Sequence, residues 1–168
     1  MSIFKKEEEK IGLVVMPDER LRKVCEPVTK FDAKLQQFVE QLATIMFTQL
    51  PWGIPAGLAA PQVGKNIRLF IVNEGLGKDR KSGDFGLFIN PVVVWETRAP
   101  KDTQNEGCFS LEKEKMDYPV PRVTSIRVRW QDMTGGFHDE RFNGMRARVM
   151  LHEIDHLDGK LVCDYQEK

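Results

Sequence analysis

The residues 151–159 read Leu-His-Glu-Ile-Asp-His-Leu-Asp-Gly and contain the pattern His-Glu-x-x-His. On a helix, residues i and i+4 lie one above the other, so the imidazoles of His152 and His156 can converge on one metal ion. Glu153 lies about 100° around the helix from His152, near enough to reach a water molecule at the metal. These are the groups needed for metal-assisted hydrolysis. The alternative is a helix that carries two histidines by chance.

The length and the charge balance exclude several classes of protein. With 168 residues, the chain fits one domain spanning 1–168, in which residues 1–10 form a charged tail. Lys+Arg and Asp+Glu both number 25, so the basic excess of a nucleic-acid-binding protein is missing. We find no signal peptide and no apolar run long enough for a membrane span. Three scattered cysteines predict no disulfide framework, and we expect a cytoplasmic protein.

Hydrophobic periodicity predicts two helices. The first runs from an N-cap at Asp32 to about Leu50, before Pro51, and its apolar residues recur at i, i+3, i+4 and i+7. The second begins at about Asn143, carries the two histidines and ends at Gly159.

Strand patterns lie between the two helices. Residues 67–72 are apolar and β-branched, and residues 87–97 form a second strand region in which Pro91 indicates an edge or a bulge. Residues 124–142 alternate in polarity around Thr-Gly-Gly and predict a β-hairpin. The sequence therefore predicts one α+β domain.

The connections are predicted to be loops. Residues 51–64 contain three glycines and three prolines, and residues 99–105 are polar. In the first of these loops, Gln62 is the side chain with strong hydrogen-bonding capacity, and the glycines allow its backbone to approach a ligand closely. An ordinary turn-rich connection is the alternative.

A metal site with two histidines lacks one protein ligand. Only nine residues follow Gly159, so we expect the third ligand to come from upstream in the chain. The candidates are His138, Cys25, Cys108 and scattered carboxylates. Cys108 lies in a small loop beside a glycine, where a thiolate could bind a borderline metal, although most free cysteines are buried and inert.

Three segments together resemble the signature motifs of the peptide deformylases. They read Gly-Leu-Ala-Ala-Pro-Gln at 57–62, Glu-Gly-Cys-Phe-Ser at 106–110 and His-Glu-Ile-Asp-His-Leu-Asp-Gly at 152–159. They occur in the order of that family and at compatible spacings, and the resemblance extends from about residue 11 to the end. The resemblance implies mostly antiparallel strands packed around a central metal-binding helix.

The resemblance also implies the ligand set and the reaction. Cys108, His152 and His156 would hold one divalent metal ion, usually Fe²⁺, which Ni²⁺ or Zn²⁺ can replace, with a fourth position open for water. The reaction is hydrolysis of the N-formyl group from formyl-methionine at the start of a nascent polypeptide, giving formate. The partners expected are formyl-methionyl nascent peptides and the ribosome exit region. We expect a monomer that binds neither nucleic acid nor membrane directly.

The family's catalytic roles transfer to matching residues. Glu153 would serve as general base and then general acid. The amide of Gln62 and the backbone N–H of Phe109 would donate to the oxyanion, and Gly57 would pair with the substrate backbone. Removal of one oxyanion donor typically costs about 10²–10³ in turnover.

Other polar residues near these motifs receive structural roles. Glu106 is either the partner that orients a ligand imidazole or an exposed loop carboxylate. The resemblance implies that Asp155 pairs with Arg122. We assign Cys25, Cys163 and His138 to packing or to the surface.

Three positions depart from the family pattern. Pro55 replaces a glycine, Phe109 replaces a leucine, and Leu151 replaces a glutamine. Pro55 restricts the loop backbone, and the ring of Phe109 is expected to reshape the methionine pocket. Two alternatives to an active deformylase therefore stay open, namely a divergent relative with altered catalysis and another metal-dependent amide hydrolase.

Overall fold

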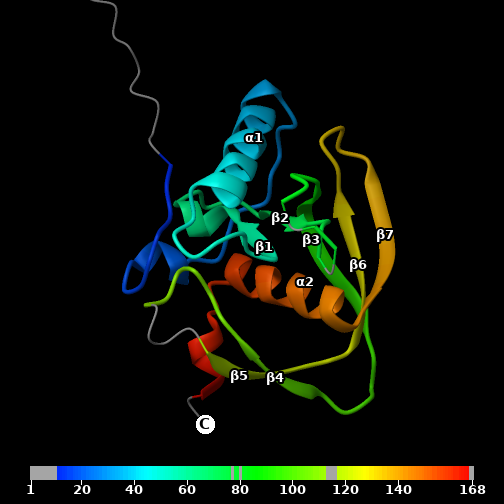
Figure 1. Ribbon diagram of the computed structural model, residues 1–168. Helices are drawn as coiled ribbons and strands as arrows, with labels where there is room; N and C mark the ends of the chain where they lie inside the picture. Colours follow the sequence, from blue (N-terminus) through cyan, green and yellow to red (C-terminus); the bar gives the residue numbers. More distant parts are fainter. Residues whose placement is uncertain (1–10, 77, 80, 113–116, 167–168) are drawn as a thin grey trace, which may run out of the picture.

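The computed structural model describes residues 11–76, 78–79, 81–112 and 117–166 (Figure 1). The predicted charged tail at residues 1–10 lies outside this range. These described residues form two α-helices, several short 3-10 helices, a five-stranded sheet and a two-stranded sheet, and the strands that pair within each sheet are antiparallel. No helix in these described ranges is long and apolar enough to cross a membrane.

Helix α1 spans Ala33–Thr48, and the Oδ1 atom of Asp32 caps it by accepting a hydrogen bond of 3.0 Å from the backbone N–H of Leu35. Helix α2 spans Gly144–Leu157 and is followed by Gly159 in the left-handed conformation with φ +71°. Both predicted helices are therefore confirmed within about two residues.

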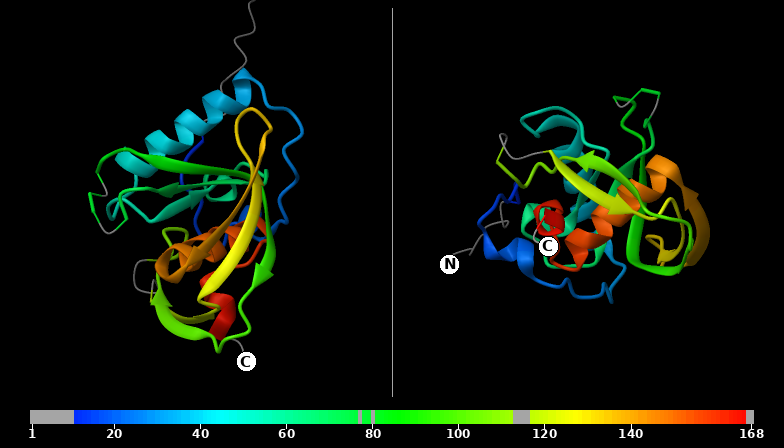
Figure 2. Two further views of the ribbon diagram at one scale, coloured as in Figure 1. Left: turned by 90° about the vertical axis from the view of Figure 1, so that its right-hand side faces the viewer. Right: turned by 90° about the horizontal axis from the view of Figure 1, so that it is seen from below.

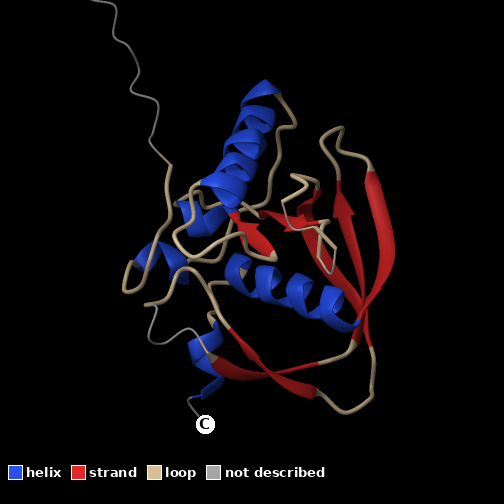
Figure 3. Cartoon of the chain, viewed as in Figure 1, coloured by secondary structure: helices blue, strands red, loops and turns tan. Residues whose placement is uncertain are grey.

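The larger sheet has the strand order β1-β2-β3-β6-β7. Its strands are β1 Gly57–Ala59, β2 Leu69–Asn73, β3 Phe85–Glu96, β6 Ser125–Gln131 and β7 Phe137–Asn143. Strands β6 and β7 form the predicted hairpin, and the strands curve around α2 (Figure 3).

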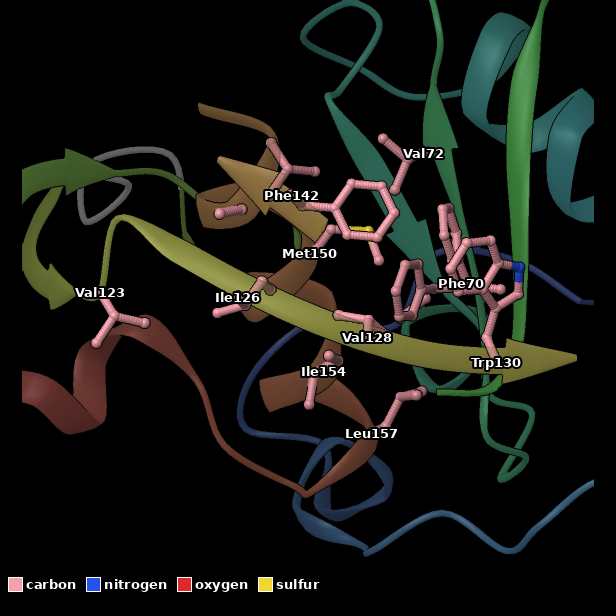
Figure 4. Packing of buried hydrophobic residues seen from close by; sticks show 14 of the residues in the cluster. Phe70, Val72, Val123, Ile126, Val128, Trp130, Phe142, Met150, Ile154 and Leu157 are labelled. Carbon is pink, nitrogen blue, oxygen red and sulfur yellow. The ribbon is translucent and has the colours of Figure 1, made fainter. Parts of the chain in front are cut away.

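Strand β2 is buried on both faces because it lies between the two helices. Leu69 and Ile71 pack in the cluster that contains the apolar side of α1, whereas Phe70 and Val72 pack with the apolar residues of α2. Figure 2 shows the strands between α1 and α2, and Figure 4 shows Phe70 and Val72 on the side of α2. Burial on two faces explains the uninterrupted apolar run in the sequence.

The α2 side of the sheet holds the largest group of buried aromatic and aliphatic side chains (Figure 4). The ring centroids of Phe70 and Phe88 lie 5.1 Å apart, and those of Phe88 and Trp130 lie 4.9 Å apart. Met150 and Leu157 of α2 are completely buried against this group. This packing fixes how α2 is rotated about its axis, and His152 and His156 lie outside this apolar group.

Pro91 lies in the central strand β3, where the pairing with β6 shifts between Ile89 and Val92. Asn90 adopts a positive φ of 50° there, and its side chain exchanges two hydrogen bonds of 2.8 Å with the backbone of Val28. Of the two predicted possibilities, an edge or a bulge, the structure has the bulge.

Two predicted loops contain strands. Residues 99–105 do not form a loop throughout, since β4 spans Asp102–Glu106 and pairs with β5, Tyr118–Arg122. Residues 57–59 form the edge strand β1, which pairs with β2. Both strands escaped prediction because polar residues, glycine and proline have low strand propensity and long-range pairing overrides it.

We predict that Gly159→Ala destabilises the protein more than Gly144→Ala. Both glycines have positive φ, +71° and +55°, so both substitutions strain the backbone. A Cβ at 159 would also overlap the carbonyl oxygen of Arg22, whereas a Cβ at 144 would meet open space. We expect Gly159→Ala to lose at least about 1 kcal/mol more unfolding free energy in urea denaturation. Equal losses would contradict this packing.

Candidate metal centre

Helix α2 places His152 and His156 on one face, with their ring centroids 5.0 Å apart. Strand β4 ends at Glu106, and the following turn brings the Sγ atom of Cys108 to 3.3 Å from Nε2 of His156. One ligand atom from each of these three residues lies within 4.8 Å of the other two. Within the described part of the chain, this is the one group of three such residues close enough to hold a metal ion.

The other candidates for the third ligand lie elsewhere. Cys25 is buried in the core beneath α2, where burial raises the pKa of its thiol to about 11. The imidazole of His138 is partly exposed on β7, 2.7 Å from a carboxylate oxygen of Asp132. Cys163 is half-buried beside Arg22. These positions agree with the predicted packing and surface roles.

The donor set fits a divalent metal ion. A thiolate with two imidazoles suits borderline ions such as Fe²⁺, Ni²⁺ and Zn²⁺. Burial, together with the neighbouring His152, lowers the pKa of His156 well below 6.5, which keeps this imidazole in the neutral form that binds metals.

Glu106 orients the imidazole of His152. Its Oε2 atom lies 3.0 Å from Nδ1 of His152, which leaves Nε2 for a metal. Arg122 donates to both oxygens of the same carboxylate, at 2.7 and 2.9 Å. Glu106 is 8% exposed, so the alternative of an exposed loop carboxylate is wrong.

The ionised form of Glu106 is strongly favoured although the side chain is buried. Burial by itself raises the pKa of a carboxyl group, but hydrogen bonds from His152 and Arg122 outweigh it and lower the pKa of Glu106 to about 2. Arg122 also donates to Asp155 at 2.9 Å, which is the predicted pair. The hydroxyl of Tyr165 donates to the same oxygen of Asp155 at 2.8 Å.

Glu153 is the second buried carboxylate of the site. Burial raises its pKa to about 7, and its Oε2 atom has no hydrogen-bond partner among the described residues. A carboxylate that titrates near neutral pH is suited to accept and return a proton.

Gly57 lies directly against Glu153. A Cβ at position 57 would be 2.6 Å from Oε1 and 2.9 Å from Cδ of Glu153. The absence of a side chain at Gly57 therefore makes room for this carboxylate. The sequence pattern did not reveal this contact, because it joins an edge strand to a helix almost a hundred residues later.

The amide of Gln62 is fixed in one orientation. Its Oε1 atom accepts a hydrogen bond of 3.0 Å from the backbone N–H of Ala59. Its Nε2 atom therefore faces the site, 3.3 Å from Oγ of Ser110 and 3.6 Å from Sγ of Cys108. Ser110 is completely buried and was not identified from the sequence.

A pocket of about 340 Å³ opens beside these groups. The residues that line it include Gly57, Gln62, Cys108, His152, Glu153, Pro55, Phe109, Trp52, Met145, Val149 and Arg148. The rings of Trp52 and Phe109 lie 5.6 Å apart at this pocket. Two of the three departures from the family pattern thus line the pocket, whereas Leu151 packs against the core.

Sequence reasoning missed the pocket residues Arg148, Met145 and Val149. Arg148 precedes His152 by four residues and therefore shares its helix face, a signal that could have found it. Met145 and Val149 lie on the same helix and line the pocket as well.

The chain was also compared with protein families and with known structures. The family model described as polypeptide deformylase matches residues 11–168. The chain belongs to the peptide deformylase family. The predicted fold and the predicted activity, removal of the N-formyl group from nascent peptides, are those of this family.

Individual relatives support this membership. A peptide deformylase of Rickettsia prowazekii (strain Madrid E) is 35% identical over 168 residues, covering 98% of this chain and 88% of the relative. The crystal structure of peptide deformylase from Thermotoga maritima superimposes with a TM-score of 0.80 at 32% identity, covering 92% of this chain and 96% of that one. The crystal structure of a peptide deformylase from Synechococcus elongatus in complex with actinonin superimposes with a TM-score of 0.81 at 30% identity, covering 92% of this chain and 79% of that one.

We predict that Glu106→Gln changes the pH dependence of stability. The pKa of Glu106 is lower in the folded state, about 2, than its ordinary value of 4.5. The contribution of the Glu106 charge to the unfolding free energy is therefore complete above pH 4.5 and is lost as the pH falls toward 2. The unfolding free energy of the wild type should decline more steeply across this window than that of Glu106→Gln, as measured by urea denaturation. If the unfolding free energies of the two proteins fell in parallel with pH, the charge of Glu106 would not stabilise the fold.

Proposed function

We propose that this chain, as one catalytic domain spanning residues 1–168, hydrolyses formyl-methionyl peptides at the site formed by Cys108, His152, His156 and Glu153. The observation that carries the proposal is the convergence of three metal-ligating atoms within 4.8 Å beside a buried carboxylate with an unpaired oxygen. A structural metal site needs neither this carboxylate nor a pocket, because such sites are closed cages of four ligands.

The thiolate of Cys108 and the imidazoles of His152 and His156 would hold one divalent ion. This ion, when bound, supplies a Lewis acid that lowers the pKa of a water molecule toward neutrality. The resemblance to the family favours Fe²⁺, whereas the ligand types suit Ni²⁺ and Zn²⁺ as well.

Glu153 carries the proton of the reaction. It accepts a proton from the water whose oxygen attacks the formyl carbon, and it then donates this proton to the leaving nitrogen. The bond between the formyl carbon and the nitrogen breaks, so the products are formate and a free amino terminus. The raised pKa of Glu153, caused by its burial, suits both transfers near neutral pH.

The oxyanion that forms during the attack requires hydrogen-bond donors. The amide of Gln62 is held with its nitrogen toward Cys108, and the backbone N–H of Phe109 is adjacent in the chain. We assign both donors to the oxyanion. Gly57, on the edge strand β1, offers its backbone to the substrate peptide.

The proposed activity suggests where the protein acts and which partners it has. The substrates are nascent peptides that start with formyl-methionine, so we place the protein in the cytoplasm near the ribosome exit region. We propose a monomer, without direct binding to nucleic acid or membrane. The apolar side chains of Val149, Met145 and Phe109 provide the pocket surface for a methionine side chain.

We predict that the Fe²⁺-loaded protein, prepared anaerobically, releases formate from formyl-Met-Ala-Ser. Glu153→Ala should lower kcat/KM by about 10² or more, because the proton carrier is lost. Formate detection under steady-state conditions provides the measurement. If the protein binds one equivalent of metal and cleaves no formyl peptide, the proposal is wrong and the chain is a divergent relative.

We predict that Gly57→Ala lowers kcat by about 10², because the new methyl group would lie 2.6 Å from Oε1 of Glu153 and would force this carboxylate out of position. Gly12→Ala is the control, since a Cβ at position 12 meets open space. Formate release gives kcat and KM separately. An increase in KM with unchanged kcat would show that Gly57 acts only through the substrate backbone.

A further inference from the structure

Strand β4 delivers Cys108 to the metal centre but has no apolar side chain. Its sequence is Asp-Thr-Gln-Asn-Glu, and its first four residues are exposed. It pairs with β5 in a two-stranded sheet, apart from the five-stranded sheet (Figure 1). The cluster that contains Val120 and Cys108 packs β5 and the turn after β4. The side chains of β4 itself add no hydrophobic burial, so its attachment to helix α2 depends on polar contacts.

Arg148 supplies such contacts from helix α2. Its Nη1 atom donates to Oε1 of Glu106 at 2.7 Å, and its Nη2 atom donates to the backbone carbonyl of Asp102 at 2.6 Å. The guanidinium thus contacts both the last and the first residue of β4. Nη1 also donates to the carbonyl of Val120 in β5, at 2.9 Å.

The position of Arg148 relates these contacts to the metal ligands. Arg148 lies one helical turn before His152, and both side chains contact the carboxylate of Glu106. Two residues after Glu106 comes Cys108. The side chain of Arg148 is 8% exposed and lines the pocket, so its hydrogen bonds form where water is largely excluded.

We propose that Arg148 is a positioning residue, which holds β4 against α2 so that Cys108 stays within reach of His152 and His156. This inference rests on the proposed function of the site. Arginine suits the task because its planar group donates several hydrogen bonds in fixed directions, whereas the ammonium of lysine acts from a single point.

The test compares Arg148→Met with Arg146→Met. Arg146 lies on the same helix and forms an ion pair with Glu74 at 2.6 Å, so both variants lose an ion-paired arginine from α2. In Arg148→Met, Glu106 keeps its pair with Arg122, so the buried carboxylate that Arg148 contacts is not left without a cation. This variant is therefore expected to fold.

Two measurements do not depend on catalysis. We expect the amide hydrogens of residues 102–106 to exchange at least 10-fold faster in Arg148→Met than in the wild type. We expect the affinity for Zn²⁺, measured by competition with a chromogenic chelator, to fall by about 10–100-fold. Arg146→Met should match the wild type in both measurements.

Arg148→Lys provides a second test. One ammonium group can contact Glu106 or the carbonyl of Asp102, but it does not span both ends of β4. We expect an exchange rate and a Zn²⁺ affinity between those of the wild type and Arg148→Met. If Arg148→Met does not fold, Arg148→Lys decides the question by the same two measurements.

The proposal is overturned if the variants lose thermal stability but keep the wild-type exchange rate in β4 and the wild-type Zn²⁺ affinity. Arg148 would then have only a general structural role. Failure of the proposed function is distinguishable, because a wild-type protein that cleaves no formyl peptide still reports on β4 exchange and Zn²⁺ binding.

Discussion

The metal centre depends on one buried carboxylate, that of Glu106. A charge taken out of water has to be compensated by close partners. Here the partners come from β5, through Arg122, and from α2, through Arg148 and His152. Glu106 itself ends β4. These contacts therefore join strands β4 and β5 to helix α2, and they orient the imidazole of His152. The same carboxylate lies two residues before Cys108, so the network that neutralises it also positions the side chain of Cys108.

Strand β1 of the larger sheet and the turn after it bring Gly57 and Gln62 to the site. Strand β1 is short and lies at the edge, and it brings Gly57 so close to Glu153 that a methyl group would not fit. The chain then turns, and the backbone of Ala59 fixes the amide of Gln62. The large buried side chains below α2, such as Met150, keep the helix in place, while His152 and Glu153 line the pocket. Packing and chemistry are thus divided between the two faces of α2.

The sequence predicted those elements whose own pattern determines them. The apolar period of α1, the alternation of 124–142 and the spacing of His152 and His156 are local signals, and the structure has each element where it was expected. Strands β4 and β5 have no such pattern, because β4 is polar and β5 contains Pro119 and Pro121. They form through pairing with each other and through the buried ion pairs, which are long-range interactions. The contact between Gly57 and Glu153 is equally invisible in the sequence.

X-ray absorption at the metal edge of Zn²⁺-loaded protein tests whether Cys108 is the third protein ligand beside His152 and His156. We expect one sulfur at about 2.3 Å and two imidazole nitrogens at about 2.0–2.1 Å, together with one oxygen from solvent. Cys108→Ser should remove the sulfur scattering, while Cys25→Ser should leave it unchanged, since Cys25 lies in the core. A spectrum without sulfur, or one that keeps its sulfur in Cys108→Ser, would contradict the assignment of Cys108 as the third ligand.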